Sequence, residues 1–150
     1  ETTLIASLAG AGKFALTERA LQSVLGVLDE VKLSFLGYPY SLLDPLYPVS
    51  GISLAGLNDI ACMKLDALSS RGTKRDFIDL YFVLKEVMTL SDLLDRFAKK
   101  YHNVNHNPIH LKKSLLYFAD ADNEPLPSML RPVAWPEVKK FFEREVTRLR

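Results

Sequence analysis

Apolar and polar positions repeat along this chain with two different periods, and the change between them falls near Gly56. Before that glycine, short runs rich in β-forming residues are separated by breaker or turn residues. These runs cover Lys13–Thr17, Gln22–Leu28 and Val31–Leu36. The pair Asp29-Glu30 leaves room only for a tight connection between the last two. The pattern therefore predicts neighbouring antiparallel strands, preceded by a short helix over residues 1–10.

After Gly56 the apolar residues recur at the three-to-four spacing of amphipathic helices. This period predicts helices over Asn58–Ser70, Lys74–Glu86, Leu90–Lys100, Pro108–Phe118 and Pro136–Leu149. Two proline-containing stretches, 37–51 and 120–135, are expected to be long connections without regular structure. The pattern indicates an α+β fold, in which a small sheet region (1–55) is followed by a helical region (56–150) within one compact unit.

Three of these helices begin near residues whose side chains can accept a hydrogen bond from an unpaired backbone N–H. Asn58 or Asp59 is expected to cap the first helix, Thr73 the second and Ser91 the third.

Composition describes an ordinary globular chain of 150 residues, with 48% hydrophobic and 25% charged residues. A net charge of +1, from 19 basic and 18 acidic side chains, excludes a strong global field for polyanions. No run has the roughly 20 apolar residues of a membrane-spanning helix. A single cysteine, Cys62, excludes an internal disulfide and favours a reducing compartment, which we expect to be the cytoplasm.

The helix predicted over 58–70 carries a lysine on its apolar side. Ile60, Ala61, Ala67 and Leu68 lie three or four positions from Lys64 and so share its face. We therefore expect Lys64 to point toward the core. A buried ammonium group is costly unless it is paired, so this position requires an acidic neighbour or a phosphate.

The following helix supplies two acidic residues, Asp76 and Asp79, three positions apart on one face. Arg71, Lys74 and Arg75 lie in or beside the intervening turn. One interpretation is an ion-pair network that joins the two helices. The other is a site that faces a phosphate, in which lysine and arginine bind the anion and a carboxylate orients or activates a group. Spacing alone does not choose between them.

Several segments resemble the AbiEii/AbiGii family of toxin nucleotidyltransferases. They are Gly51-Ile-Ser-Leu-Ala, Asn58-Asp-Ile-Ala, Met63-Lys-Leu-Asp-Ala-Leu and Arg71-Gly-Thr-Lys-Arg-Asp-Phe-Ile-Asp-Leu, with Val31-Lys-Leu-Ser-Phe-Leu and Tyr38-Pro-Tyr before them. The run from Lys64 to Leu80 is the most specific. The resemblance covers about Leu4 to Leu84, and the later helices only in general character.

The resemblance implies a fold similar to DNA polymerase β-type nucleotidyltransferases, with transfer of a nucleotide from an NTP, in the presence of Mg²⁺, to an RNA or protein acceptor. It also implies a possible antitoxin partner. Lys64, Arg71 and Arg75 would bind the nucleotide. Asp76 and Asp79, which match an Arg-Asp-x-x-Asp motif, would be catalytic: Asp76 as base or substrate-positioning group, Asp79 holding Lys64 or an arginine. No residue is assigned as a metal ligand.

The first motif of that family, a Gly-Gly or Gly-Ser pair followed by Asp-x-Asp, is not found in this sequence and is expected upstream of Leu4. Ser34 occupies the position where a third carboxylate would lie. The complete protein is then expected to extend further at its N-terminus. The alternative is a non-catalytic binding module that contacts an antitoxin or another partner.

Three histidines, His102, His106 and His110, recur at every fourth position and could line up as metal ligands on a continuous helix. Asparagines at 103, 105 and 107 and a proline at 108 interrupt any such helix. The sequence favours a polar loop leading into the next helix over a metal site.

Overall fold

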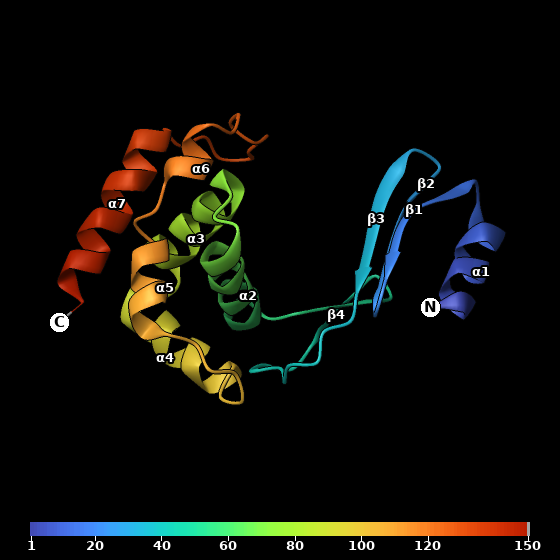
Figure 1. The fold of residues 1–150 in the computed structure, drawn as a ribbon, viewed down its shortest axis with the longest axis horizontal. Coiled ribbons are helices and arrows are strands. Elements are labelled where there is room, and N and C mark those ends of the chain that lie inside the picture. The colour runs from blue at the N-terminus through green and yellow to red at the C-terminus, as the bar shows by residue number, and fades with distance from the viewer. Residues whose placement is uncertain (150) are drawn as a thin grey trace. The chain divides into compact units, whose positions relative to one another are not determined.

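The computed structural model describes residues 1–149, and the chain forms two compact units that divide between Pro39 and Tyr40. The first unit contains α1 (Thr2–Ala11), β1 (Phe14–Ala20), β2 (Ser23–Leu28) and β3 (Val31–Leu36). The second contains β4 (Tyr47–Val49), β5 (Ile52–Leu54), α2 (Leu57–Ser70), α3 (Lys74–Glu86), α4 (Leu90–Lys100), α5 (Pro108–Ser114), α6 (Ala119–Asp122) and α7 (Trp135–Arg148) (Figure 1). The expected α+β fold class is confirmed.

The first unit is an antiparallel sheet in the order β1-β2-β3, accompanied by α1. Asp29 and Glu30 both have positive φ, 46° and 71°, as the two central residues of a tight type I′ hairpin turn require. That turn sets the register of β2 and β3, with Leu28 opposite Val31. Gly26 lies in the middle of β2, where a Cβ atom would come within 2.4 Å of the Phe14 ring.

The β4–β5 hairpin occupies part of the segment expected to be an unstructured connection, so that expectation was wrong. Ser50 and Gly51 have φ values of 48° and 80°, which again fits a two-residue hairpin turn. Pro48 lies within β4 although it cannot donate a ladder hydrogen bond. A two-stranded ribbon tolerates this, because each of its strands has an edge without a partner strand.

Residues 40–55 belong with the helices, whereas the sequence placed the boundary at 55/56. The physical reason is Asp59 of α2, whose carboxylate accepts hydrogen bonds from the backbone N–H groups of Leu43 and Asp44 at 3.0–3.1 Å. Lys100 of α4 lies 2.5 Å from the same carboxylate and donates to the carbonyl of Ser41 at 2.9 Å. Both charged side chains are completely buried. Through these hydrogen bonds the ion pair holds residues 41–44, which precede the β4–β5 hairpin, against α2 and α4.

The hydrophobic core of the second unit lies between the helices. α2 packs against α3, α4 and α5, and α3 also packs against α6 and α7. The largest fully buried side chains of this core are Tyr81, Phe77, Phe97, Phe142, Leu65, Leu80 and Leu93. Among the helices that the structure describes, none is long and apolar enough to cross a membrane.

Of the N-cap residues predicted for α2, α3 and α4, only that of α3 is confirmed. Thr73 caps α3 by accepting a hydrogen bond from the backbone N–H of Asp76, as predicted. The predicted caps of the other two helices were wrong. Gly56 precedes α2, where a Cβ atom would lie 2.7 Å from the Asp44 carboxylate, and Thr89 caps α4 in a reciprocal capping box with Asp92.

Two boundaries near the C-terminus also differ from expectation. α5 ends at Ser114 rather than at residue 118, and α6 begins at Ala119 and extends into the stretch predicted to be a connection. Trp135 is the first residue of α7, and its ring packs against Phe77 and Phe118 with centroid distances of 5.7 and 5.9 Å. α6 precedes α7 in the chain, and the long segment between them becomes important for the site.

Candidate functional site

The candidate site lies at the turn that joins α2 to α3. Gly72 adopts φ 53° there, a left-handed conformation that glycine reaches at little cost. This residue lets the chain reverse between Arg71, the C-cap residue that follows α2, and Thr73, which caps α3. The reversal brings the last turns of α2 alongside the first turns of α3.

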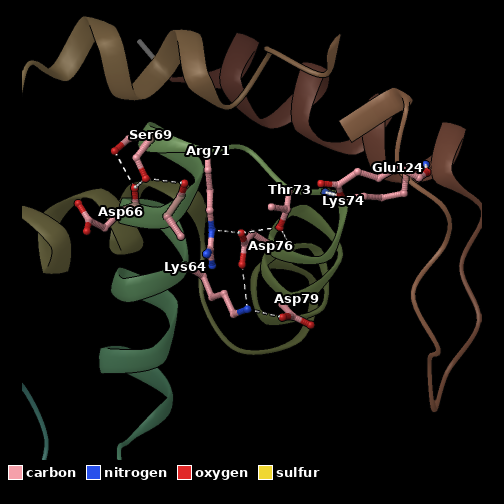
Figure 2. A network of polar contacts seen from close by, with 11 residues as sticks. Lys64, Asp66, Ser69, Arg71, Thr73, Lys74, Asp76, Asp79 and Glu124 are labelled. Atoms are coloured by element: carbon pink, nitrogen blue, oxygen red, sulfur yellow. Dashed lines mark hydrogen bonds and ion pairs between the residues drawn. The ribbon is translucent and has the colours of Figure 1, made fainter. Parts of the chain in front are cut away.

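Lys64 of α2 joins the two carboxylates of α3. Its Nζ lies 2.9 Å from Oδ1 of Asp76 and 2.7 Å from Oδ2 of Asp79 (Figure 2). Arg71 approaches the other oxygen of Asp76, with Nε at 3.4 Å from Oδ2. The structure therefore brings together four of the five residues that the sequence assigned to the site, and joins them in one continuous ion-pair network.

Asp76 is the buried centre of this network, with only 1% of its surface exposed. Burial tends to raise the pKa of this carboxyl, but hydrogen bonds from the Thr73 hydroxyl and Lys64, and the charges of Lys64 and Arg71, outweigh burial and lower it. The Thr73 hydroxyl donates to Oδ2 at 2.6 Å. Asp76 is therefore held in its charged form.

Lys64 is less buried than the sequence implied, because 26% of its side chain remains exposed. Ala61 and Leu68 on its helix face are buried, but Ile60 is 37% exposed, so this face meets the core only in part. Partial burial lowers the pKa of Lys64, and hydrogen bonds to Asp79 and Asp76 raise it overall. The ammonium group is thus charged and partly open to solvent.

The network forms one wall of a pocket of about 590 Å³. The opposite wall is the segment Glu124–Pro127, and Arg71, Thr73 and Arg75 complete the lining. Among residues 1–149, the Arg75 guanidinium forms no hydrogen bond or ion pair, and it is exposed. The pocket therefore presents one uncommitted cation beside two cations that are already paired.

Glu124 is held in place by Lys74, the first residue of α3. The Lys74 backbone N–H donates to Oε2 of Glu124 at 2.7 Å, and its Nζ donates to the Glu124 carbonyl oxygen. Sequence reasoning missed this second wall, since it lies about fifty positions downstream of the motif. Its prolines indicated a rigid connection, but nothing in the sequence placed that connection beside α3.

The residues present do not form a magnesium site by themselves. Asp76 and Asp79 share the Lys64 ammonium, and within residues 1–149 no group of three or more His, Cys, Asp or Glu side chains could hold a metal. The chain does contain Asp120-Ala-Asp122, but these lie two positions apart on α6, and Asp122 binds Trp135 and Lys139 at 2.6 and 2.8 Å.

The remaining candidates lie outside this pocket. Ser34 is in β3 of the first unit, opposite Leu25. His106 packs against the ring of Phe97 at 4.8 Å, and His110 lies in α5 with Nε2 2.9 Å from the Ser69 carbonyl oxygen. His102 lies in the turn after α4.

Fold and site together describe an α+β protein whose helical unit presents a cationic pocket built on a Lys and Arg-Asp-x-x-Asp motif. A profile of the family described as "Nucleotidyl transferase AbiEii toxin, Type IV TA system" matches residues 26–148. The chain therefore belongs to the AbiEii nucleotidyltransferase toxin family, which confirms the resemblance. The match continues through the later helices as well as the motif region.

One curated relative, the uncharacterized protein aq_aa25 of Aquifex aeolicus (strain VF5), is 41% identical over 127 residues. The aligned region covers 83% of this chain and 60% of the relative. The match thus spans about 60% of the relative's length, less than two thirds. No solved structure gives a significant match.

Proposed function

We propose that the pocket between α3 and the segment Glu124–Pro127 binds the triphosphate of an NTP, as part of a nucleotidyltransferase. The observation that carries this proposal is the grouping of Lys64, Arg71 and Arg75 on one pocket, with Arg75 uncommitted. Arginine presents several N–H donors in a planar fork that matches phosphate oxygens, and lysine adds a point charge. A purely structural ion-pair network would not require the third, unpaired cation.

In this proposal the two aspartates have different tasks. The lowered pKa of Asp76 makes it a poor proton acceptor near neutral pH, so its task is to position Lys64 and Arg71. Asp79, whose side chain is 45% exposed, is the carboxylate that can reach a substrate. Lys64 would exchange part of its contact with Asp79 for phosphate oxygens.

The reaction expected of the complete protein is transfer of a nucleotidyl group to an RNA or protein hydroxyl. An oxygen of the acceptor forms a bond to the α-phosphorus, the bond to pyrophosphate breaks, and the acceptor loses its proton. Mg²⁺ would accompany the NTP and reduce the repulsion between its phosphates. Lys64, Arg71 and Arg75 would add further positive charge beside the phosphates. NTPs and RNA are found in the cytoplasm, where we place the protein.

The family description implies an antitoxin that opposes the protein. A non-catalytic module that only contacts such a partner would have no use for the NTP pocket. A measurement of nucleotide binding by this chain therefore distinguishes a nucleotidyltransferase from a non-catalytic binding module. The balanced net charge of +1 means that an RNA acceptor would be held by local contacts rather than by a general field.

The test is the change in melting temperature of the chain with increasing NTP and Mg²⁺, because a ligand stabilises the state that binds it. We expect the melting temperature of wild type to rise and then saturate with NTP concentration. In Arg75→Ala the apparent affinity for NTP, taken from the same curve, should be roughly tenfold lower. Arg96→Ala, an exposed arginine of α4, is the matched control and should behave as wild type. No rise with any NTP, or equal weakening in both variants, would contradict the proposal.

A further inference from the structure

A second hollow, of about 330 Å³, lies on the same side of α3 as the cationic pocket and shares Arg75 and Pro127 with it. Its other walls are different in chemistry. α3 contributes Ile78, Asp79 and Phe82, and the segment after Pro127 continues along it to Arg131. Beyond Arg75 the lining thus changes from mainly charged to largely apolar.

The far end of this hollow holds Arg131, whose guanidinium group contacts an aromatic ring and a carboxylate. The guanidinium carbon of Arg131 lies 4.5 Å from the centroid of the Phe82 ring, and one of its terminal nitrogens lies 2.8 Å from Glu86. Contact with the face of an aromatic ring and pairing with a carboxylate restrict the orientation of the group. The Arg131 side chain is still 59% exposed, so it remains accessible.

The spacing along α3 suits a molecule with an anionic end and a planar end. Arg75 and Phe82 are seven positions apart and lie on one helix face. At a rise of 1.5 Å per residue, their Cα atoms are about 10 Å apart along the helix axis. Asp79 lies between them on the same face. A nucleotide spans such an interval when its base, its ribose and its first phosphates are counted together.

Resting on the proposed function, we propose that this hollow is the nucleoside subsite of the NTP pocket. The base lies against the Arg131 guanidinium and the apolar wall beside Phe82, while the phosphates extend past Arg75 toward Lys64. Stacking on a guanidinium plane is available to every base. The subsite therefore gives affinity for the nucleoside part without requiring one particular base.

Calorimetric titrations with inorganic tripolyphosphate and with each of the four NTPs test this subsite, with Mg²⁺ present throughout. Tripolyphosphate carries the anionic end without a nucleoside. Wild type should bind each of the four NTPs roughly tenfold more tightly than tripolyphosphate. Arg131→Ala and Arg131→Lys should both lose most of that preference and keep the affinity for tripolyphosphate, because lysine retains the charge but not the plane.

Arg144→Ala is a matched control. Arg144 likewise lies over an aromatic ring, that of Phe141 at 5.2 Å, and pairs with a glutamate, Glu145 at 2.9 Å, on α7. The Arg144→Ala variant should bind both tripolyphosphate and the NTPs with the affinity of wild type. All variants should melt close to wild type, because exposed ion pairs contribute little to stability.

Each contrary outcome has a distinct meaning. If tripolyphosphate binds and no NTP binds more tightly, the nucleoside subsite is overturned and the phosphate pocket stands. Equal weakening of both ligands in Arg131→Ala would overturn the subsite by assigning Arg131 to the phosphates. A loss in Arg144→Ala that matched the loss in Arg131→Ala would also overturn it. If wild type binds neither ligand, the proposed function and the subsite fail together.

Discussion

The ammonium nitrogen of Lys64 lies 2.9 Å from a carboxylate oxygen of Asp76, twelve positions further along the chain and on a different helix. Asp76 is buried, while Lys64 keeps part of its surface in solvent. The pair therefore neutralises a buried charge and at the same time leaves a cation facing the pocket. Stability and ligand binding are linked through one contact, and variants at this pair should show both effects.

Lys64→Met should destabilise the protein by about 2 kcal/mol, because it leaves Asp76 buried with a weaker set of partners. Arg71 and Thr73 remain, so the cost should stay below that of a fully isolated charge. The measurement is urea unfolding followed by circular dichroism. The double variant Lys64→Met/Asp76→Asn should recover part of the loss, whereas additive losses would mean that the two side chains are not coupled.

The lowered pKa of Asp76 predicts a specific dependence of stability on pH. Its folded pKa lies below the ordinary value of 3.8, so the carboxylate contributes stability above about that pH. The contribution is lost as pH falls from there through the folded pKa. Asp76→Asn should therefore be less stable than wild type near neutral pH, and the difference should shrink below pH 3.8. A difference in unfolding free energy that stays constant from neutral to acid pH would contradict this.

The buried pair Asp59–Lys100 should be more important for stability than any surface ion pair. Both side chains are completely buried, so removal of either partner leaves an uncompensated charge in the core. Lys100→Met and Asp59→Asn should each cost about 3 kcal/mol in unfolding free energy. The double variant should cost no more than one of the singles. A double variant whose loss equals the sum of both would exclude the coupling.

Cys62 should be inert in the folded protein. Its side chain is completely buried, and burial raises the pKa of the thiol to about 11. Since the thiolate is the reactive form, an aromatic disulfide reagent should label the native protein only as fast as it unfolds. In concentrated guanidinium chloride, one thiol per chain should react at once. Rapid labelling under native conditions would show that the thiol is accessible.

Local pattern determined much of the secondary structure of this protein. The strands from β1 to β3 and the helices α2, α3 and α4 form within a few residues of where hydrophobic periodicity placed them. Their side chains alternate or recur with the period of the element that they form, and this property is local. Motif spacing likewise indicated that Lys64, Asp76 and Asp79 belong together.

Tertiary contacts, rather than the local sequence, decided where α2 begins. Asn58 and Asp59 had the right chemistry to cap α2, but Asn58 donates to Asp44 and Asp59 binds Lys100. These two interactions connect residues that are 14 and 41 positions apart. A sequence window of helical length does not contain both partners, so the helix start could not be read from it.

The far wall of the pocket depended on the tertiary structure in the same way. Glu124 lies beside Lys74 because α6, the segment after it and α7 pack against α3, and no motif records that arrangement. The sequence by itself determined the family, the main elements and the charged residues of the site. Only packing decided which of those charges are buried, which remain available, and what lies opposite them. Packing brings together residues that are distant in the chain.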